Sequence, residues 1–317
     1  MKLYIIGNGF DIAHGLETWY WEFRKFLENT HPEFLLLFEK IYNIEPLDDS
    51  EPWYTEEMQK RWNKSVDHVL WSTFEEKMGT PNIQSMLDLS ESIISGMDSE
   101  MIECGIKDTM DVFWREEYGY IKKLQKYVKE WVEEIDLSEI KPKKKSLINN
   151  DEDYFFNFNY TNVLEEIYNI ENVIHIHGSV GKQAMIEPFM GHCNKGDIQN
   201  YRKLANDANE EYNDAESSIC DTAADYLEVI YKDTSYFIKF YESYFKKLNS
   251  VDEIVIIGWS AGDADLPYLC KIRDSINKDA IWTAYFYDEK SKEKIKSAFV
   301  KNNIRNYCLK PSEQFWI

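Results

Sequence analysis

Basic residues are outnumbered in this sequence. Lys and Arg total 36 against 57 Asp and Glu, which leaves a formal charge of -21 at pH 7. An acidic excess of this size opposes diffuse binding to phosphate backbones and to anionic lipid. Nucleic acid and membrane are therefore not expected as partners, and the Lys-rich stretch at 141–145 is interpreted as a solvated connection.

Cysteine and long apolar runs are also scarce. The five cysteines lie far apart without a Cys-x-x-Cys pair, so neither a disulfide framework nor a zinc ribbon is indicated. The sequence has no apolar run long enough for a membrane span, and the run at 3–6 is too short for a signal peptide. These features predict a cytoplasmic protein with reduced thiols.

The apolar content is sufficient for a large core. With 317 residues, 44% hydrophobic and 15% aromatic, the chain predicts two domains or one domain with a large insertion. Short apolar runs alternate with helical patterns, which predicts an α/β fold with a Rossmann-like parallel sheet. The predicted strands lie at residues 3–6, 154–159, 172–177, 184–190, 253–257, 281–287 and near 307.

Long helix-forming stretches interrupt this alternation twice. We expect a nucleotide-binding core of residues 1–17, 151–198 and 250–317, a helical insertion at 18–150 and a second, acidic helical excursion at 199–249. Aromatic residues in the insertion recur at helical spacing, which is more typical of core packing than of a cofactor site.

Loops that follow the predicted strands are the candidate ligand sites, since ligands of open parallel sheets bind beyond the carboxyl ends of the strands. The first loop is Gly7-Asn8-Gly9-Phe10-Asp11. Its glycines permit a tight turn and a close approach of backbone N–H groups to a phosphate, although a purely structural turn would look the same. Asp11 would repel a pyrophosphate, so it either caps a helix beginning near Ile12 or contacts a ribose hydroxyl or a metal ion.

Two further strands end in polar residues. Asn159 follows one of them, and period two places His175 and His177 on one face of the other. A neutral imidazole can act as a general base, and an amide can orient a water or a sugar hydroxyl. Purely structural roles are the alternative. The His-x-His pattern also suggests a metal pair, but the following residues offer no third ligand, so no metal is expected.

The last loop runs from Gly258 through Ser260 to Asp263 and Asp265. Its small residues would let the backbone pass close to a ligand, and its carboxylates could bind ribose hydroxyls. The stretch also fits the Gly-x-Ser-x-Gly nucleophile elbow of α/β-hydrolases. That fold needs a histidine after the serine, whereas the last histidine of this chain is His192.

Five stretches and one aspartate follow one another in a characteristic order. They are residues 5–16, 71–75, 156–162, 175–179 and 256–260, with Asp265. In this order they resemble the bacteriophage abortive-infection AbiH family over nearly the whole chain. The resemblance implies an antiviral effector that responds to a phage-derived trigger.

The glycine loops resemble, more distantly, those of sirtuins and of sirtuin-like NAD hydrolases. Gly7, Gly9 and Gly15 keep the glycine spacing of the sirtuin Gly-Ala-Gly loop, and Gly258 and Ser260 fall on the sirtuin Gly-Thr-Ser stretch. The resemblance implies a sirtuin-like fold in which these loops hold a dinucleotide. The residues assigned to ligand binding are Gly7, Asn8, Gly9, Phe10, Asp11, Gly178, Gly258, Ser260, Asp263 and Asp265.

The sirtuin resemblance also implies two catalytic residues. Asn159 falls on the asparagine of the sirtuin Gln-Asn-Ile-Asp stretch, and His177 falls on the catalytic His-Gly. Three positions depart from the pattern: Asn8 replaces an alanine, Asp11 a serine and Thr161 an aspartate. The missing zinc ribbon makes protein deacylation less expected than hydrolysis of the nucleotide itself.

The leading hypothesis is therefore an abortive-infection enzyme that hydrolyses the nicotinamide–ribose bond of NAD or a related nucleotide, with no permanently bound cofactor. His177 would accept a proton, Asn159 would position a hydroxyl, and Glu75, from the helical insertion, could reach the site as a lid carboxylate. A non-catalytic sensor of a nucleotide or phage protein is the alternative. A metal-dependent phosphohydrolase using His175 is a third reading. The insertion could also serve as the surface of a homo-oligomer.

Overall fold

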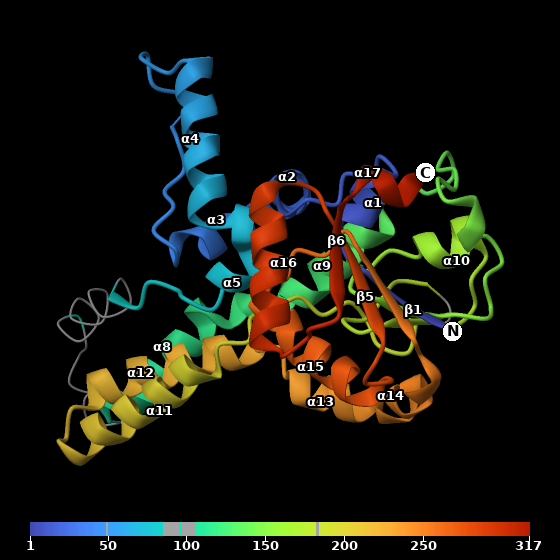
Figure 1. The fold of residues 1–317 in the computed structure, drawn as a ribbon. Helices are drawn as coiled ribbons and strands as arrows, with labels where there is room; N and C mark the ends of the chain where they lie inside the picture. Colours follow the sequence, from blue (N-terminus) through green and yellow to red (C-terminus); the bar gives the residue numbers. More distant parts are fainter. Residues whose placement is uncertain (49, 85–95, 97–104, 182–183) are drawn as a thin grey trace. The chain divides into compact units, whose positions relative to one another are not determined.

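The computed structural model describes residues 1–48, 50–84, 96, 105–181 and 184–317 (Figure 1). They form two compact units, which are described separately. Unit 1 comprises Met1–Glu22, Val128–Phe189 and Asp233–Ile317, and unit 2 comprises Phe23–Tyr127 and Met190–Lys232. Residues 233–249, expected in the acidic excursion, belong to unit 1. Part of the expected insertion, at 85–95 and 97–104, lies outside the described residues.

Unit 1 is built on a six-stranded parallel sheet with the strand order β3-β2-β1-β4-β5-β6. The strands are β1 (Lys2–Ile6), β2 (Tyr154–Asn157), β3 (Val173–His175), β4 (Glu253–Ile257), β5 (Ile281–Phe286) and β6 (Tyr307–Pro311). This order is that of Rossmann-like doubly wound folds, whose ligand crevice lies where the order reverses, here between β1 and β4. The predicted Rossmann-like α/β fold is confirmed.

One predicted strand is wrong. Residues 184–190 form a loop that folds back on the chain, because Ser179 N–H donates to the Ile186 carbonyl (3.1 Å) and Phe189 N–H to the His177 carbonyl (2.8 Å). The apolar residues that suggested a strand, Ile186 and Phe189, pack against the core instead. A short apolar run is consistent with either outcome.

The side-chain alternation of β1 separates two cores. Leu3 and Ile5 face one side of the sheet and Tyr4 and Ile6 the other, as period two requires. The first side packs against α13 (Thr234–Phe240), α14 (Glu242–Lys247), α15 (Leu266–Ser275) and α16 (Glu289–Lys301). The second packs against α1 (Gly9–Ala13), α10 (Val163–Tyr168) and α17 (Glu313–Trp316).

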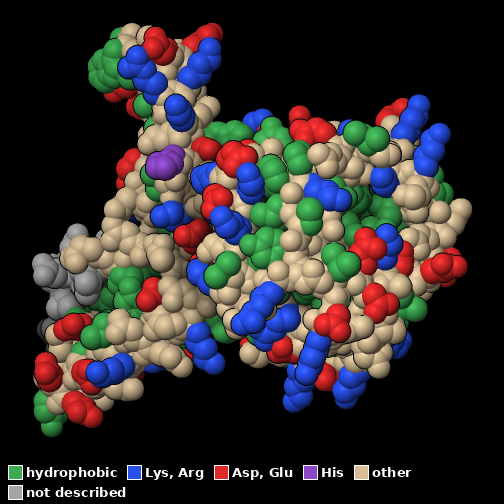
Figure 2. All heavy atoms as spheres, viewed as in Figure 1, with side chains coloured by type: hydrophobic (Ala, Val, Ile, Leu, Met, Phe, Trp, Pro, Cys, Tyr) green, Lys and Arg blue, Asp and Glu red, His purple; other side chains and the backbone are tan. Residues whose placement is uncertain are grey.

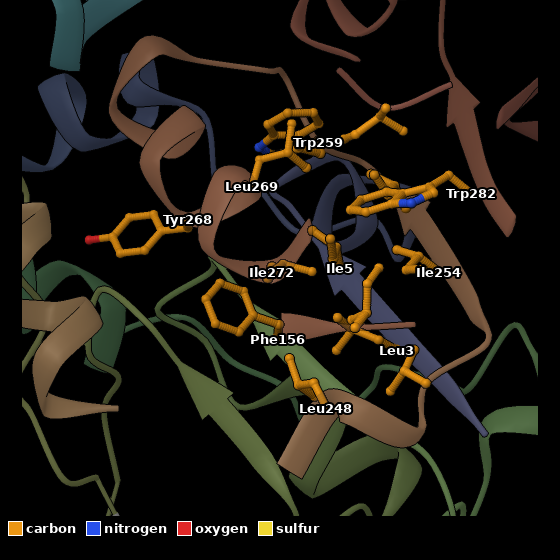
Figure 3. Packing of buried hydrophobic residues seen from close by; sticks show 14 of the residues in the cluster. Leu3, Ile5, Phe156, Leu248, Ile254, Trp259, Tyr268, Leu269, Ile272 and Trp282 are labelled. Carbon is orange, nitrogen blue, oxygen red and sulfur yellow. The ribbon is translucent and has the colours of Figure 1, made fainter. Parts of the chain in front are cut away.

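Burial of large side chains stabilises this arrangement. Figure 3 shows Leu3 and Phe156 of the sheet packed with Leu248 and Ile272, and all four side chains are fully buried. Each contributes roughly 1.5–3 kcal/mol through removal of apolar surface from water. The sheet is therefore a rigid base for the loops at its carboxyl edge.

Unit 2 is helical and contains α3 (Pro32–Lys40), α4 (Glu56–Val69), α5 (Phe74–Lys77), α8 (Ile106–Glu117), α11 (Lys195–Glu210) and α12 (Asp214–Val229). Two further helices, α2 (Tyr20–Thr30) and α9 (Leu124–Glu133), cross the unit boundaries. Trp71 stacks on Phe74 with ring centroids 4.4 Å apart, and Phe23 and Phe38 pack around them. The interpretation as core is confirmed for these four residues, whereas Trp19, which belongs to the same aromatic series, is 53% exposed.

An ion pair is buried within this aromatic core. The Arg24 guanidinium donates to both carboxylate oxygens of Glu39, at 2.8 and 3.1 Å, and Trp71 Nε1–H donates to the same carboxylate at 2.7 Å. Arg24 and Glu39 are only 3% and 5% exposed. The Glu39 carboxylate, which belongs to α3, therefore links this helix to α2 through Arg24 and to the segment before α5 through Trp71.

Charges on the surface are mixed. On the face shown in Figure 2, Lys and Arg side chains are interspersed with Asp and Glu. Helix α16 carries pairs of this kind, Lys292 with Glu289 and Lys296 with Glu293. Among the described helices, none has the length and apolar character to cross a bilayer.

We predict that Glu39→Gln lowers the free energy of unfolding by about 3–5 kcal/mol, because it removes the buried carboxylate to which the buried Arg24 guanidinium donates two hydrogen bonds. Urea denaturation followed by tryptophan fluorescence measures the change. Glu28→Gln is the matched control, since Glu28 also pairs with Arg24 but has a 54% exposed side chain, and its loss should stay below about 1 kcal/mol. Equal losses in the two variants would contradict the prediction.

Candidate functional site

Two glycine loops meet where the strand order reverses. Gly9 N–H donates to the Gly258 carbonyl at 2.9 Å, and a Cβ on Gly7 would lie only 2.6 Å from that same oxygen. Gly258 has φ +70°, and a Cβ there would lie 2.3 Å from Phe10 N. The glycines thus allow the loop after β1 and the loop after β4 to pack directly on each other, which explains their presence without any ligand.

The Asn8 side chain fastens the first loop. Its Nδ2 donates to the Thr18 carbonyl at 2.7 Å, and Thr18 Oγ1 donates to Asn8 Oδ1 at 2.6 Å. The adjacent Phe10 is fully buried and packs against His14, Tyr168 and Trp316. In this conformation both side chains stabilise the loop.

Asp11 lies inside α1 and is buried, with 1% of its surface exposed. The expectation that it caps a helix beginning near Ile12 is wrong, because the helix begins at Gly9 and its N-cap is Asn8. The Asp11 carboxylate instead accepts hydrogen bonds from Asn159 Nδ2 (2.8 Å) and Thr161 Oγ1. It therefore connects the loop after β1 with the loop after β2.

Burial raises the pKa of Asp11 to about 7, although the hydrogen bonds from Thr161 and Asn159 act in the opposite direction. Desolvation is the largest effect because the carboxylate has exchanged water for only these few partners. At neutral pH the group lies close to its titration midpoint, which makes it a candidate for proton transfer as well as for positioning.

The Asn159 amide is oriented by the hydrogen bonds that its Nδ2 donates. Its Nδ2 donates to Asp11 and, more weakly, to the Gly7 carbonyl at 3.3 Å. In the described part of the chain, no group donates to its Oδ1, so this oxygen is the atom that can accept a hydrogen bond from a ligand hydroxyl. Asn159 does not cap α10, whose N-cap is Asn162.

His177 follows β3 and is 3% exposed. Its Nε2 lies 3.9 Å from Asp265 Oδ1, within ion-pair distance, and Asp265 is itself fixed by a hydrogen bond from Trp259 Nε1 at 2.9 Å. The rings of Phe158 and Tyr268 pack against the imidazole at 5.4 and 5.6 Å. At 3.9 Å the contact is longer than a hydrogen bond, so Asp265 is placed to stabilise a charged imidazolium but does not fix the orientation of the ring.

Gly178 makes the turn after His177. Its φ is +81°, and a Cβ would lie 2.1 Å from the Glu187 carbonyl oxygen. Only glycine fits this crossing of two backbone segments, so Gly178 determines where His177 lies.

His175 and His177 do not continue one alternating strand, because β3 ends at His175. The His175 ring lies 2.8 Å from the Asn159 carbonyl through Nδ1 and 2.7 Å from Glu165 Oε1 through Nε2. Both of its nitrogens are thus engaged away from His177. No set of three metal-ligating side chains is gathered anywhere in the described residues.

The remaining candidates are placed differently. Ser260 and Asp263 are exposed in and after the loop that follows β4. Glu75 belongs to unit 2, where it accepts a hydrogen bond from the fully buried Lys232 at 2.9 Å. Sequence reasoning missed Glu165 and the Asp11 contact of Thr161. The one available signal was position: Glu165 lies in the helix that follows β2, and Thr161 lies just before that helix.

A groove of about 880 Å³ borders Thr161 in unit 1. Four carboxylates line it together with Asn162, and these are Glu133, Glu134, Asp136 and Glu166. Such a lining disfavours a phosphate and favours a neutral or cationic group. Any phosphates of a bound nucleotide would then lie outside this groove.

The fold and the site define a Rossmann-like α/β protein with buried polar residues where its strand order reverses. The family described as bacteriophage abortive infection AbiH matches residues 3–287, and the chain belongs to this family. Its role therefore falls within abortive infection, an antiviral defence. Searches of curated proteins and of solved structures found no match.

Asp11 gives a prediction about stability and pH. The raised pKa means that the folded state binds a proton which the unfolded chain has released, from about pH 4 to about pH 7. The free energy of unfolding therefore falls as pH rises through this window. Asp11→Asn removes this contribution.

Between pH 5 and 8, the stability of the wild type relative to Asp11→Asn should fall by about 2–3 kcal/mol. Urea unfolding of both proteins across this range, at one ionic strength, measures the difference. A difference that stays constant with pH would show that Asp11 titrates like an exposed aspartate.

Proposed function

We propose that this AbiH protein hydrolyses the nicotinamide–ribose bond of NAD, or of a related nucleotide, as the effector step of abortive infection. The observation that carries the proposal is the placement of Asn159 and His177. They follow neighbouring strands at the carboxyl edge of a Rossmann-ordered sheet, and each is paired with a buried aspartate, Asp11 or Asp265. A titratable base or an amide beside a buried carboxylate is typical of catalytic sites.

The reaction has a defined proton and charge balance. Water adds to C1′ of the ribose and loses a proton, while the nicotinamide nitrogen takes the electron pair of the breaking bond and becomes neutral. The products are nicotinamide and ADP-ribose. The transition state resembles an oxocarbenium ion, so nearby carboxylates stabilise it and a base must accept the proton of water.

Each residue has a role in this scheme. His177 accepts the proton, and Asp265 stabilises the imidazolium that forms. Asn159 accepts a hydrogen bond from the attacking water or from a ribose hydroxyl through Oδ1, because its amide hydrogens are directed to Asp11 and Gly7. Asp11 thereby fixes the orientation of Asn159.

Two features support a nucleotide with a cationic ring. The acidic groove beside Thr161 suits the positively charged pyridinium of NAD better than a phosphate. The second feature is the pair of positions 11 and 161, where the sirtuin pattern has a serine and an aspartate. This chain has the carboxylate at Asp11 and the hydroxyl at Thr161 instead, and the hydroxyl donates a hydrogen bond to the carboxylate. The pyrophosphate would then lie toward the loops that carry Gly9 and Ser260.

The test is release of nicotinamide from NAD by the purified chain, with His177→Ala and Asn159→Ala. Loss of the general base or of the positioning amide should lower the rate by roughly 10²-fold or more. His68→Ala and Asn209→Ala are matched controls, since both residues are exposed on helices of unit 2. Circular dichroism establishes that all variants fold.

A rate that survives in His177→Ala would remove the assignment of the base. Thermal shift with NAD on the same samples separates the alternatives. A shift without turnover would favour a nucleotide sensor, and the absence of both would mean that the ligand is not NAD.

A further inference from the structure

His175 lies between two hydrogen-bond acceptors. Its Nδ1 is 2.8 Å from the Asn159 carbonyl oxygen and its Nε2 is 2.7 Å from Glu165 Oε1. A carbonyl has no proton to donate, so Nδ1 must carry one. The contact with Glu165 then also needs a proton, either on Nε2 or on the carboxyl group.

We propose that His175 and Glu165 share one proton beyond those of a neutral imidazole and a carboxylate, and that this pair positions Asn159 for the reaction. The inference rests on the proposed function. Loss of the shared proton would place the Nε2 lone pair opposite a carboxylate oxygen at 2.7 Å, which is repulsive. The β2–α10 loop would then lose a fixed partner for the Asn159 carbonyl.

The pair is largely buried, so water cannot replace a hydrogen bond that is lost when the shared proton leaves. The His175 side chain is 8% exposed and that of Glu165 29%, and Glu165 Oε2 is buried without a hydrogen-bond partner among the described residues. Asp11 of α1 interacts with both groups electrostatically. Tyr241, at the end of α13, donates its hydroxyl proton to the His175 carbonyl at 3.0 Å. The same carbonyl accepts from Gly178 N–H at 3.1 Å, and Asn159 contacts the pair through its carbonyl oxygen.

The protonation state can be measured without any substrate. In protein with ¹⁵N-labelled histidine and ¹³C-labelled glutamate, NMR at pH 7 should show either a doubly protonated His175 or a protonated Glu165. His175→Gln assigns the histidine signal. In Glu165→Gln the imidazole should become the neutral form with its proton on Nδ1. A neutral His175 together with an ionised Glu165 in the wild type would overturn the proposal.

The positioning role is tested by kinetics. Glu165→Ala should lower kcat for NAD cleavage about tenfold or more with little change in KM, because His175 loses the partner of its Nε2 and Asn159 is misplaced while substrate contacts remain. Glu165→Gln should retain the wild-type kcat, because its amide can donate to Nε2 while Nδ1–H still donates to the Asn159 carbonyl. Glu171→Gln, an exposed glutamate just before β3, is the matched control and should leave both parameters unchanged.

The two measurements separate the two proposals. A shared proton in a protein without NAD cleavage would refute the proposed function and keep the pair. NAD cleavage with a neutral His175 and an ionised Glu165 would refute the pair and keep the function. An unchanged kcat in Glu165→Ala would refute the positioning role.

Discussion

The buried carboxylate of Asp11 is the interaction on which the candidate site depends. It is nearly inaccessible to water, and its principal compensation is two hydrogen bonds, from Asn159 and Thr161. An unpaired carboxylate in such a place would be strongly disfavoured, so these two side chains are constrained as firmly as Asp11 itself. The carboxylate on α1 thereby determines the conformation of the loop after β2.

The glycines supply the second constraint. Gly7, Gly9 and Gly258 have no side chains at the point where the strand order reverses. The backbones of the loops after β1 and β4 therefore fill the space there. A Rossmann crevice normally receives the ligand there. In this protein the polar residues lie beside the closed crossing, after β2 and β3, which shifts the candidate chemistry from the glycine loop toward Asn159 and His177.

The positions of the strands could be read from the sequence, whereas their side-chain partners could not. The runs at 3–6 and 253–257 are apolar and end in glycine, and both form strands of the sheet. Residues 184–190 have a similar composition but are held as a loop by backbone hydrogen bonds to the segment around Gly178. Period and composition carry no information about such long-range bonds.

The lack of information about long-range bonds also explains why the partners of the site residues could not be predicted from the sequence. Asp11 is unusual in the sequence because a carboxylate does not suit a phosphate loop. Its partners are about 150 positions away, and only the parallel pairing of β1 with β2 brings them together.

The two histidines show the same effect. Alternation places His175 and His177 on one face, although β3 ends between them. Once the strand ends, the two imidazoles have different partners: His175 forms a hydrogen bond with Glu165, whereas His177 Nε2 lies within ion-pair distance of Asp265. The site thus contains two histidine–carboxylate pairs. The pair that borders Asn159 acts on the position of the amide, and the pair beside Trp259 is the one suited to accept a proton.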